Sequence, residues 1–244
     1  GPTNLEYSAD YVGEMCRLVE DETQAPCLFL QGGCGDINPY YDKTAIDDGA
    51  VSAMRKAGET CASTVLALWP DIETKAPEKA AVAYSEQDVH VGSRWDLLDP
   101  EQQQIFAEAH GGLSGFFSFY LQKAKPDLAV PLSMVVLNNE VALVGVPGEF
   151  FTYSQQVLKA GSPLDSTLLC GYVNDWHAYF PPVRDAVAGG YGGTMASYVG
   201  LGAADKVLTE GLIEVARLIG DGPRKCTPLD FEIVDFAPTK EEQA

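Results

Sequence analysis

The sequence predicts an α/β fold, with an α+β arrangement as the alternative, in which mixed β-sheets are covered by helices. Three observations predict this fold. Segments with helical periodicity and short apolar runs follow one another along the chain. Two apolar runs flank Asn138-Asn139, a pair that suits a tight hairpin turn. Hydrophobic residues make up 46% of the 244 residues, which is enough to build a sizeable core.

Each element is predicted by its own local pattern. Apolar residues spaced three or four apart predict helices, and Trp69-Pro70 and Gly161 stop two of them. The predicted helices are residues 11–21, 45–68, 100–110, 150–160 and 197–219. Short apolar or alternating runs predict strands. The predicted strands are residues 27–30, 79–91, 132–137, 140–146, 167–170 and 229–236. An aromatic cluster at 116–121 predicts a further core helix, with the lining of an apolar channel as second interpretation.

Composition limits the classes of partner. No internal repeat or low-complexity linker interrupts the chain, so residues 1–244 are predicted to form a single domain. The formal net charge is −19, because 16 basic residues face 35 acidic ones. Nucleic acid is therefore not an expected partner, since binding it requires clustered Lys and Arg. No apolar run approaches the roughly 20 residues of a membrane helix, so no transmembrane segment is expected.

The first candidate for chemistry is Glu149. A short apolar strand at 141–146 runs into Pro147-Gly148 and delivers this carboxylate at its tip. Rigid scaffolds often present chemical groups at strand ends. Glu149 would then serve as a metal ligand or a general base. The plainer interpretation is a carboxylate that stabilises the positive end of the following helix.

A second candidate region is the long segment 171–195, whose Gly, Pro and aromatic content favours an ordered functional loop. Its polar and aromatic residues include Asn174, Trp176, His177, Tyr179 and Tyr191. A catalytic tyrosine would donate a hydrogen bond to a developing oxyanion, and ordinary packing is the alternative for both tyrosines. His177 alone predicts little, because the three histidines share neither H-E-x-x-H nor H-x-H spacing.

The third candidate region is the glycine-rich run Gly32-Gly33-Cys34-Gly35-Asp36-Ile37-Asn38-Pro39. Its backbone N–H groups could converge on an anion or an oxyanion. It lacks the Lys-Ser/Thr of a phosphate loop and the G-x-G-x-x-G of a dinucleotide site. A tight turn after a strand is the alternative, because Asp36 and Asn38 are common turn residues.

Together the three regions resemble the neutral/alkaline ceramidase family, whose members are zinc-dependent amidases that cleave the N-acyl bond of ceramide. Residues 31–39 are similar to the family's Q-x-x-x-G-D-[VI]-S-P loop. Residues 146–150 are similar to its P-G-E-F-T segment, and residues 171–191 to its G-L-x-N-x-Y-x-x-Y stretch and the Tyr-Glu-Gly that follows. The three motifs occur in the family's order, and the resemblance runs from the start of the chain to about residue 219.

The resemblance implies a ceramidase catalytic-domain fold and a zinc-dependent hydrolase of an amide (N-acyl) bond, with a lipid among the possible substrates. Carried over by position, Glu149 and Tyr179 would bind zinc, and Tyr191 would stabilise the oxyanion with the help of Asn38. The substrate-binding residues would be Gly35, Asp36, Asn174 and Trp176. An extracellular or periplasmic location is also implied.

The sequence differs from the family's motifs at several positions, and these differences alter what we expect of the site. Asn38 stands where the family has a serine, and Asn cannot form an acyl-enzyme, so a zinc-activated water would attack directly. Trp176 stands where the family has its first tyrosine. The family's two histidine ligands lie upstream of the position that matches Gly1, so the chain resembles the C-terminal half of the catalytic domain. An N-terminal half or a separate chain would supply those histidines. The alternative is an inactive scaffold that serves as a structural or assembly subunit.

Overall fold

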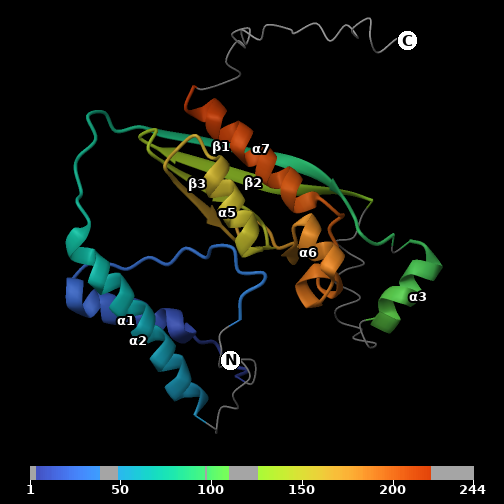
Figure 1. The fold of residues 1–244 in the computed structure, drawn as a ribbon, viewed down its shortest axis with the longest axis horizontal. Helices are drawn as coiled ribbons and strands as arrows, with labels where there is room; N and C mark the ends of the chain where they lie inside the picture. The colour runs from blue at the N-terminus through green and yellow to red at the C-terminus, as the bar shows by residue number, and fades with distance from the viewer. Residues whose placement is uncertain (1–3, 39–48, 97, 110–125, 221–244) are drawn as a thin grey trace, which may run out of the picture.

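A computed structural model describes residues 4–38, 49–96, 98–109 and 126–220, and it confirms the α/β fold (Figure 1). The strands are β1 (Val82–Gly92), β2 (Asp127–Leu137), β3 (Val141–Gly145), β4 (Glu149–Phe150), β5 (Ser166–Cys170) and β6 (Tyr179–Phe180). The helices are α1 (Asp10–Thr23), α2 (Ala50–Leu68), α3 (Pro100–Ala109), α5 (Thr152–Gly161), α6 (Val183–Ala188) and α7 (Ala203–Leu218). A 3₁₀ turn, η2 (Trp69–Asp71), and a π turn, η3 (Tyr191–Met195), complete the set.

A four-stranded mixed sheet, in the order β1-β2-β3-β5, forms the centre of the molecule. The β1–β2 and β2–β3 pairs are antiparallel, whereas β3 and β5 are parallel. The predicted hairpin is confirmed: Asn138 and Asn139 have φ angles of 55° and 57°, the left-handed values that such a turn requires. Because β3 and β5 are parallel, they end at the same edge of the sheet.

The main core lies between the sheet and two helices. Helices α5 and α7 contact each other, α7 packs on β1 and β2, and α5 packs on β5. Leu132 and Val144 face α7 and are fully buried, and a side chain at Gly211 of α7 would lie 3.3 Å from Val144. The burial of apolar side chains between the sheet and these helices therefore fixes the position of the strand ends.

Helices α1 and α2 pack against each other as a helical pair, away from the sheet in the view of Figure 1. Met15, Val19 and Ala62 form a separate small core between them. This confirms the two predicted N-terminal helices, and the first residues predicted for the second one lie outside the described residues.

One predicted strand, at 27–30, is wrong. This segment is a loop, and Leu28 is 88% exposed. Strand formation needs a neighbouring strand to satisfy the backbone groups, and the described residues place none beside it. The predicted helix at 197–219 begins later, at Ala203, because Gly202 adopts a left-handed φ of 83° just before it. The elements predicted at 116–121 and 229–236 lie outside the described residues.

None of the described helices combines the length and the apolar character that crossing a bilayer requires.

Leu132→Ala tests the sheet–helix core. Because Leu132 is fully buried, we expect the free energy of unfolding to fall by about 2–5 kcal/mol. Leu201→Ala is the matched control, since Leu201 is 65% exposed and should lose little. Urea denaturation followed by circular dichroism measures both, and equal losses would contradict this description of the core.

Candidate active site

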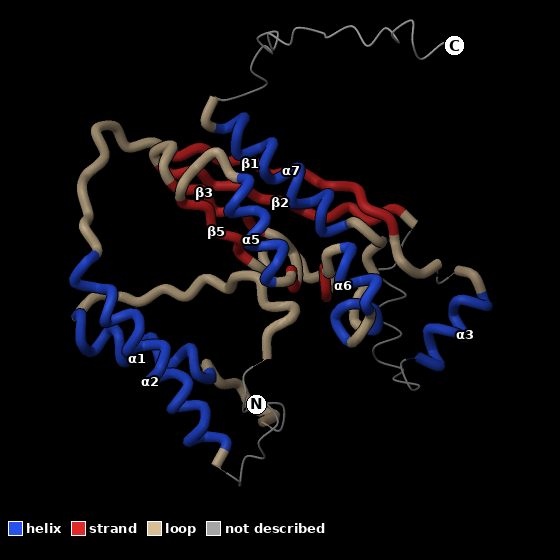
Figure 2. Tube along the Cα trace, viewed as in Figure 1, coloured by secondary structure: helices blue, strands red, loops and turns tan. Residues whose placement is uncertain are grey.

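The sequence motifs meet beyond the shared end of β3 and β5. Beyond the last paired residues of β3 and β5, Val146 N–H donates to the Cys170 carbonyl at 2.8 Å. Val173 N–H then donates to the Val146 carbonyl at 3.0 Å. A second parallel pair, β4 and β6, then forms (Figure 2), with Glu149 opposite Tyr179. Two residues that lie thirty positions apart in the sequence (179 − 149) are therefore backbone neighbours.

The β4–β6 pairing depends on a close backbone approach at Gly148. Glu149 N–H donates to the Ala178 carbonyl at 2.8 Å. A Cβ atom on Gly148 would lie 2.5 Å from that same oxygen, so only glycine fits this position. Ala178 has a φ of 55°, an uncommon left-handed value for a residue with a side chain. Backbone strain of this kind is concentrated at functional sites.

The Glu149 carboxylate lies among phenols. The hydroxyls of Tyr179 and Tyr172 lie near enough to it for its negative charge to act on them. Burial raises the pKa of both phenols, and their interaction with the Glu149 carboxylate adds to the rise. At neutral pH both hydroxyls are therefore protonated. The arrangement gathers several oxygen donors at one point.

The glycine-rich loop lies against this strand tip. Gly35 N–H donates to the Phe150 carbonyl at 2.9 Å, and Gly33 N–H donates to Gln155 Oε1 at 2.8 Å. The Cys34 Sγ atom lies 3.4 Å from the Tyr172 hydroxyl. Burial raises the pKa of the Cys34 thiol. All three sequence regions thus meet around Glu149, as the resemblance implies.

Asp36 has a clear structural partner. Its two carboxylate oxygens accept hydrogen bonds from the backbone N–H and the hydroxyl of Thr152, both at 2.7 Å. Thr152 is the first residue of α5, so Asp36 caps this helix. Asp36 thus places a carboxylate at the positive end of α5, and the similar role considered for Glu149 stays a prediction. Substrate binding by Asp36 and by Gly35 stays a prediction.

Tyr191 lies beside the metal-ligand candidates. Its ring meets the Tyr179 ring edge-on, with centroids 5.4 Å apart and planes at 79°. Tyr191 is 60% exposed, so its hydroxyl is open to an incoming molecule. Arg94 Nη1 donates to the Gly193 carbonyl at 2.6 Å and so anchors the turn η3 that carries Tyr191. Asn38 is exposed, at the end of a described segment.

Asn174 and Trp176 differ in their surroundings. Asn174 Nδ2 donates to Ser133 Oγ at 2.7 Å, so this amide contacts the sheet through β2. Trp176 is 37% exposed and leaves part of its ring open to solvent. The structure does not test substrate binding by either residue, and both assignments stay predictions.

His177 is the buried polar residue whose role the sequence did not indicate. Its Nδ1 atom lies 2.7 Å from the hydroxyl of fully buried Tyr198, and its Nε2 atom lies 3.2 Å from Asp175 Oδ2. Its backbone N–H also donates to the Pro147 carbonyl at 2.6 Å. His177 therefore fastens the segment before Tyr179 to the segment before Glu149.

The sequence did not predict Tyr172 or Cys34 as site residues. Tyr172 lies two residues past the end of β5, and Glu149 follows β3 after a short turn. Knowledge that these two strands are parallel neighbours would have placed Tyr172 near Glu149, but strand order is not visible in the sequence. Cys34 was recognised only as part of the glycine-rich loop.

The described residues contain no complete metal site. No group of three or more His, Cys, Asp or Glu side chains in the described ranges is placed to hold a metal ion. What they offer is the Glu149 carboxylate and the neighbouring Tyr179 hydroxyl. Oxygen donors of this kind fit zinc, which usually takes four ligands in proteins.

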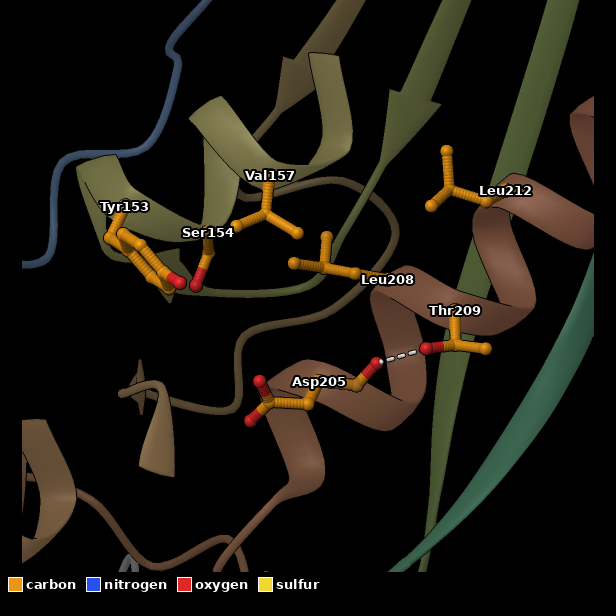
Figure 3. Close-up of a pocket in the computed structure, with 7 residues that line it drawn as sticks. All are labelled: Tyr153, Ser154, Val157, Asp205, Leu208, Thr209 and Leu212. Carbon is orange, nitrogen blue, oxygen red and sulfur yellow. Dashed lines mark hydrogen bonds between the residues drawn. The ribbon is translucent and has the colours of Figure 1, made fainter. Parts of the chain in front are cut away.

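A separate groove lies between α5 and α7 (Figure 3). Its lining residues are Tyr153, Ser154, Val157, Asp205, Leu208, Thr209 and Leu212. None of the predicted site residues lines this groove.

Comparison with known proteins defines the class of the fold. Neutral ceramidase from Pseudomonas aeruginosa superposes with a TM-score of 0.63 at 14% identity, over 92% of this chain and 43% of that chain. A ceramidase complexed with C2 superposes with a TM-score of 0.62 at 14% identity, over 90% and 44%. No family model and no curated protein matches the sequence. The chain therefore has the fold of a ceramidase over less than half the length of those solved chains.

Tyr198→Phe tests the hydrogen bond between His177 and the Tyr198 hydroxyl. The change leaves the His177 ring buried without its hydroxyl partner, so we expect the free energy of unfolding to fall by about 1–3 kcal/mol. Tyr153→Phe is the control, because Tyr153 is 39% exposed and should change little. Chemical denaturation measures the stability of both variants. A Tyr198→Phe variant as stable as the parent would show that this hydrogen bond does not stabilise the fold.

Proposed function

We propose that this chain forms part of the active site of a metal-dependent amidase, in which Glu149 and Tyr179 are two of the zinc ligands. The observation that carries the proposal is the β4–β6 pairing, which sets Glu149 opposite Tyr179 in a fold shared with ceramidases. The partial burial of Tyr179 and its interaction with the Glu149 carboxylate support it further.

Two further ligands must come from outside the described residues. Zinc sites that combine carboxylate with imidazole are common among hydrolases. His90, the other described histidine, pairs with Asp127 at 2.9 Å and is exposed on β1, and His177 is engaged by Tyr198 and Asp175. The solved ceramidase chains are more than twice as long as the part that this chain matches. Histidines from a remaining portion of the domain, or from a separate chain, would complete the ligand set.

When bound, zinc supplies a water of lowered pKa and polarises the carbonyl under attack. The residues of this chain would then bind and orient the substrate. Tyr191 is exposed beside Tyr179 and would donate its hydroxyl proton in a hydrogen bond to the oxyanion. Asn38, also exposed, would add an amide donor from the glycine-rich loop.

The segments that carry these groups also expose large apolar side chains. Tyr172 is 47% exposed, Trp176 is 37% exposed and Met195 is 42% exposed. Exposed apolar groups near a catalytic centre favour a substrate with an apolar portion. An amide with a fatty N-acyl chain fits this chemistry, and we propose it as the substrate class.

A catalytically inactive scaffold is the second candidate function. It is favoured by Asn38, which cannot act as a covalent nucleophile, and by the partial ligand set of the described residues. The two candidates differ in metal content, so the experiments below distinguish them.

Glu149→Gln tests the zinc assignment. In the protein with its complete ligand set, we expect the zinc affinity to fall by more than about 100-fold, because even residues that only support a ligand cost about 10–100-fold. Glu140→Gln, in the exposed hairpin turn, is the control and should bind zinc as the parent does. Chelator competition with elemental analysis measures both. A parent protein that folds and assembles without zinc would favour the inactive scaffold.

Tyr191→Phe tests the oxyanion assignment. We expect kcat on a fluorogenic N-acyl amide to fall about 10²–10³-fold, the typical effect of losing one oxyanion donor. Zinc content should stay unchanged, because Tyr191 is not proposed as a ligand. Tyr153→Phe is the control and should retain kcat. Unchanged turnover in Tyr191→Phe would remove Tyr191 from the mechanism.

A further inference from the structure

Three cysteines gather at the helical pair of α1 and α2 (Figure 1). Cys16 of α1, Cys27 of the following loop and Cys61 of α2 pack against the small core between these helices. All three are free thiols in the structure, and each is partly buried. Cys34, by contrast, lies against Tyr172 in the candidate site. The first three thiols therefore form a group of their own.

The end of α1 turns the chain back toward Cys16. Gln24 caps the helix with a left-handed φ of 52°, and its N–H donates to the Glu20 carbonyl at 2.9 Å. Three residues later, Cys27 N–H donates to the Glu20 carboxylate at 2.9 Å. Cys16 and Glu20 are four residues apart on α1, so their side chains lie on the same face of the helix. The backbone of Cys27 is therefore attached to the side chain that neighbours Cys16.

The electrostatics of the thiols agree with this placement. Burial raises the pKa of the Cys16 thiol, and the neighbouring Cys27 thiol and Glu20 carboxylate raise it further. Cys61 acts on a different group: after burial, it contributes most to the raised pKa of the Tyr11 phenol. Cys27 is therefore the partner that the structure favours for Cys16.

We propose that Cys16 and Cys27 form a disulfide when they meet a disulfide oxidant, R–S–S–R. One cysteine attacks a sulfur of the oxidant as its thiolate, which forms a mixed disulfide and releases the first R–S⁻. The other cysteine, also as its thiolate, attacks the cysteine sulfur of the mixed disulfide and displaces the second R–S⁻. The two thiols thus lose two electrons and two protons, and the oxidant is reduced to two R–SH.

The surroundings of Cys16 favour the disulfide over the free thiols. Thiol pairs are strongly oxidising where the protein stabilises their reduced form. Here burial and the Glu20 carboxylate act against a thiolate at Cys16. The bond would also close a loop between positions eleven apart (27 − 16), which restricts the unfolded chain. It is therefore a structural disulfide, of the kind that persists in oxidising compartments.

The disulfide would tie the helical pair to the segment that leads into the candidate site. Four residues after Cys27, the Gln31 carbonyl accepts a hydrogen bond from Gly171 N–H at 2.8 Å. The glycine-rich loop with Asn38 follows. The disulfide would therefore add a covalent bond, at the start of this segment, to the hydrogen bond that the Glu20 carboxylate accepts there.

Disulfide mapping tests the proposal on the natural full-length protein, which is reduced and then equilibrated with excess oxidised glutathione. The remaining thiols are blocked with N-ethylmaleimide, and the protein is digested with chymotrypsin before mass spectrometry. Chymotrypsin is needed because Cys27 and Cys34 share one tryptic peptide, and cleavage after Phe29 separates them. We expect most molecules to yield a peptide pair that joins Cys16 to Cys27 and that dissociates on reduction.

Two variants complete the test. Cys61→Ser is the matched control and should yield the same peptide pair. Cys27→Ser should leave Cys16 labelled with N-ethylmaleimide, and the oxidised parent should melt about 5–10 °C above this variant. Reduction of the parent should remove this difference. Labelling of both Cys16 and Cys27 in the oxidised parent, or a bond from Cys27 to Cys34 or Cys61, would overturn the proposal. Neither measurement depends on zinc or turnover, so the result is independent of the proposed amidase function.

Discussion

The backbone hydrogen bond from Glu149 N–H to the Ala178 carbonyl is the constraint on which the candidate site depends. It closes the β4–β6 pair and fixes the carboxylate opposite the Tyr179 phenol. The bond forms only because Gly148 has no side chain and Ala178 accepts a left-handed backbone. The contact between His177 and Tyr198 also holds this segment in place. Packing and backbone geometry together bring the polar groups of the site to one point.

Much of the fold could be predicted because its signals are local. Asn138-Asn139 identified the hairpin through the left-handed conformations that asparagine tolerates, and apolar spacing identified α1, α5 and the strands of the sheet. The segment 27–30 failed because an apolar run specifies burial, whereas a strand also needs a neighbour. Its Leu28 is 88% exposed in the described structure. Such a neighbour is a tertiary property that the local pattern does not contain.

The sequence likewise predicted some residues of the candidate site and missed others. Glu149 and Tyr179 could be named from motif order, and the structure pairs them across two strands. Tyr172 could not, because its closeness to Glu149 follows from the parallel order of β3 and β5. The capping role of Asp36 was also invisible, since its partner Thr152 lies 116 residues away. The chain matches less than half the length of the solved ceramidase chains, and the described residues offer only part of the proposed ligand set.

Anomalous X-ray diffraction at the zinc edge, on crystals of the complete zinc-loaded protein, tests the central claim most directly. The account predicts one anomalous peak within about 2.0–2.2 Å of a Glu149 carboxylate oxygen, with the Tyr179 hydroxyl on the same ion. A peak bound elsewhere, or a zinc ion that contacts only one of these two side chains, would contradict it.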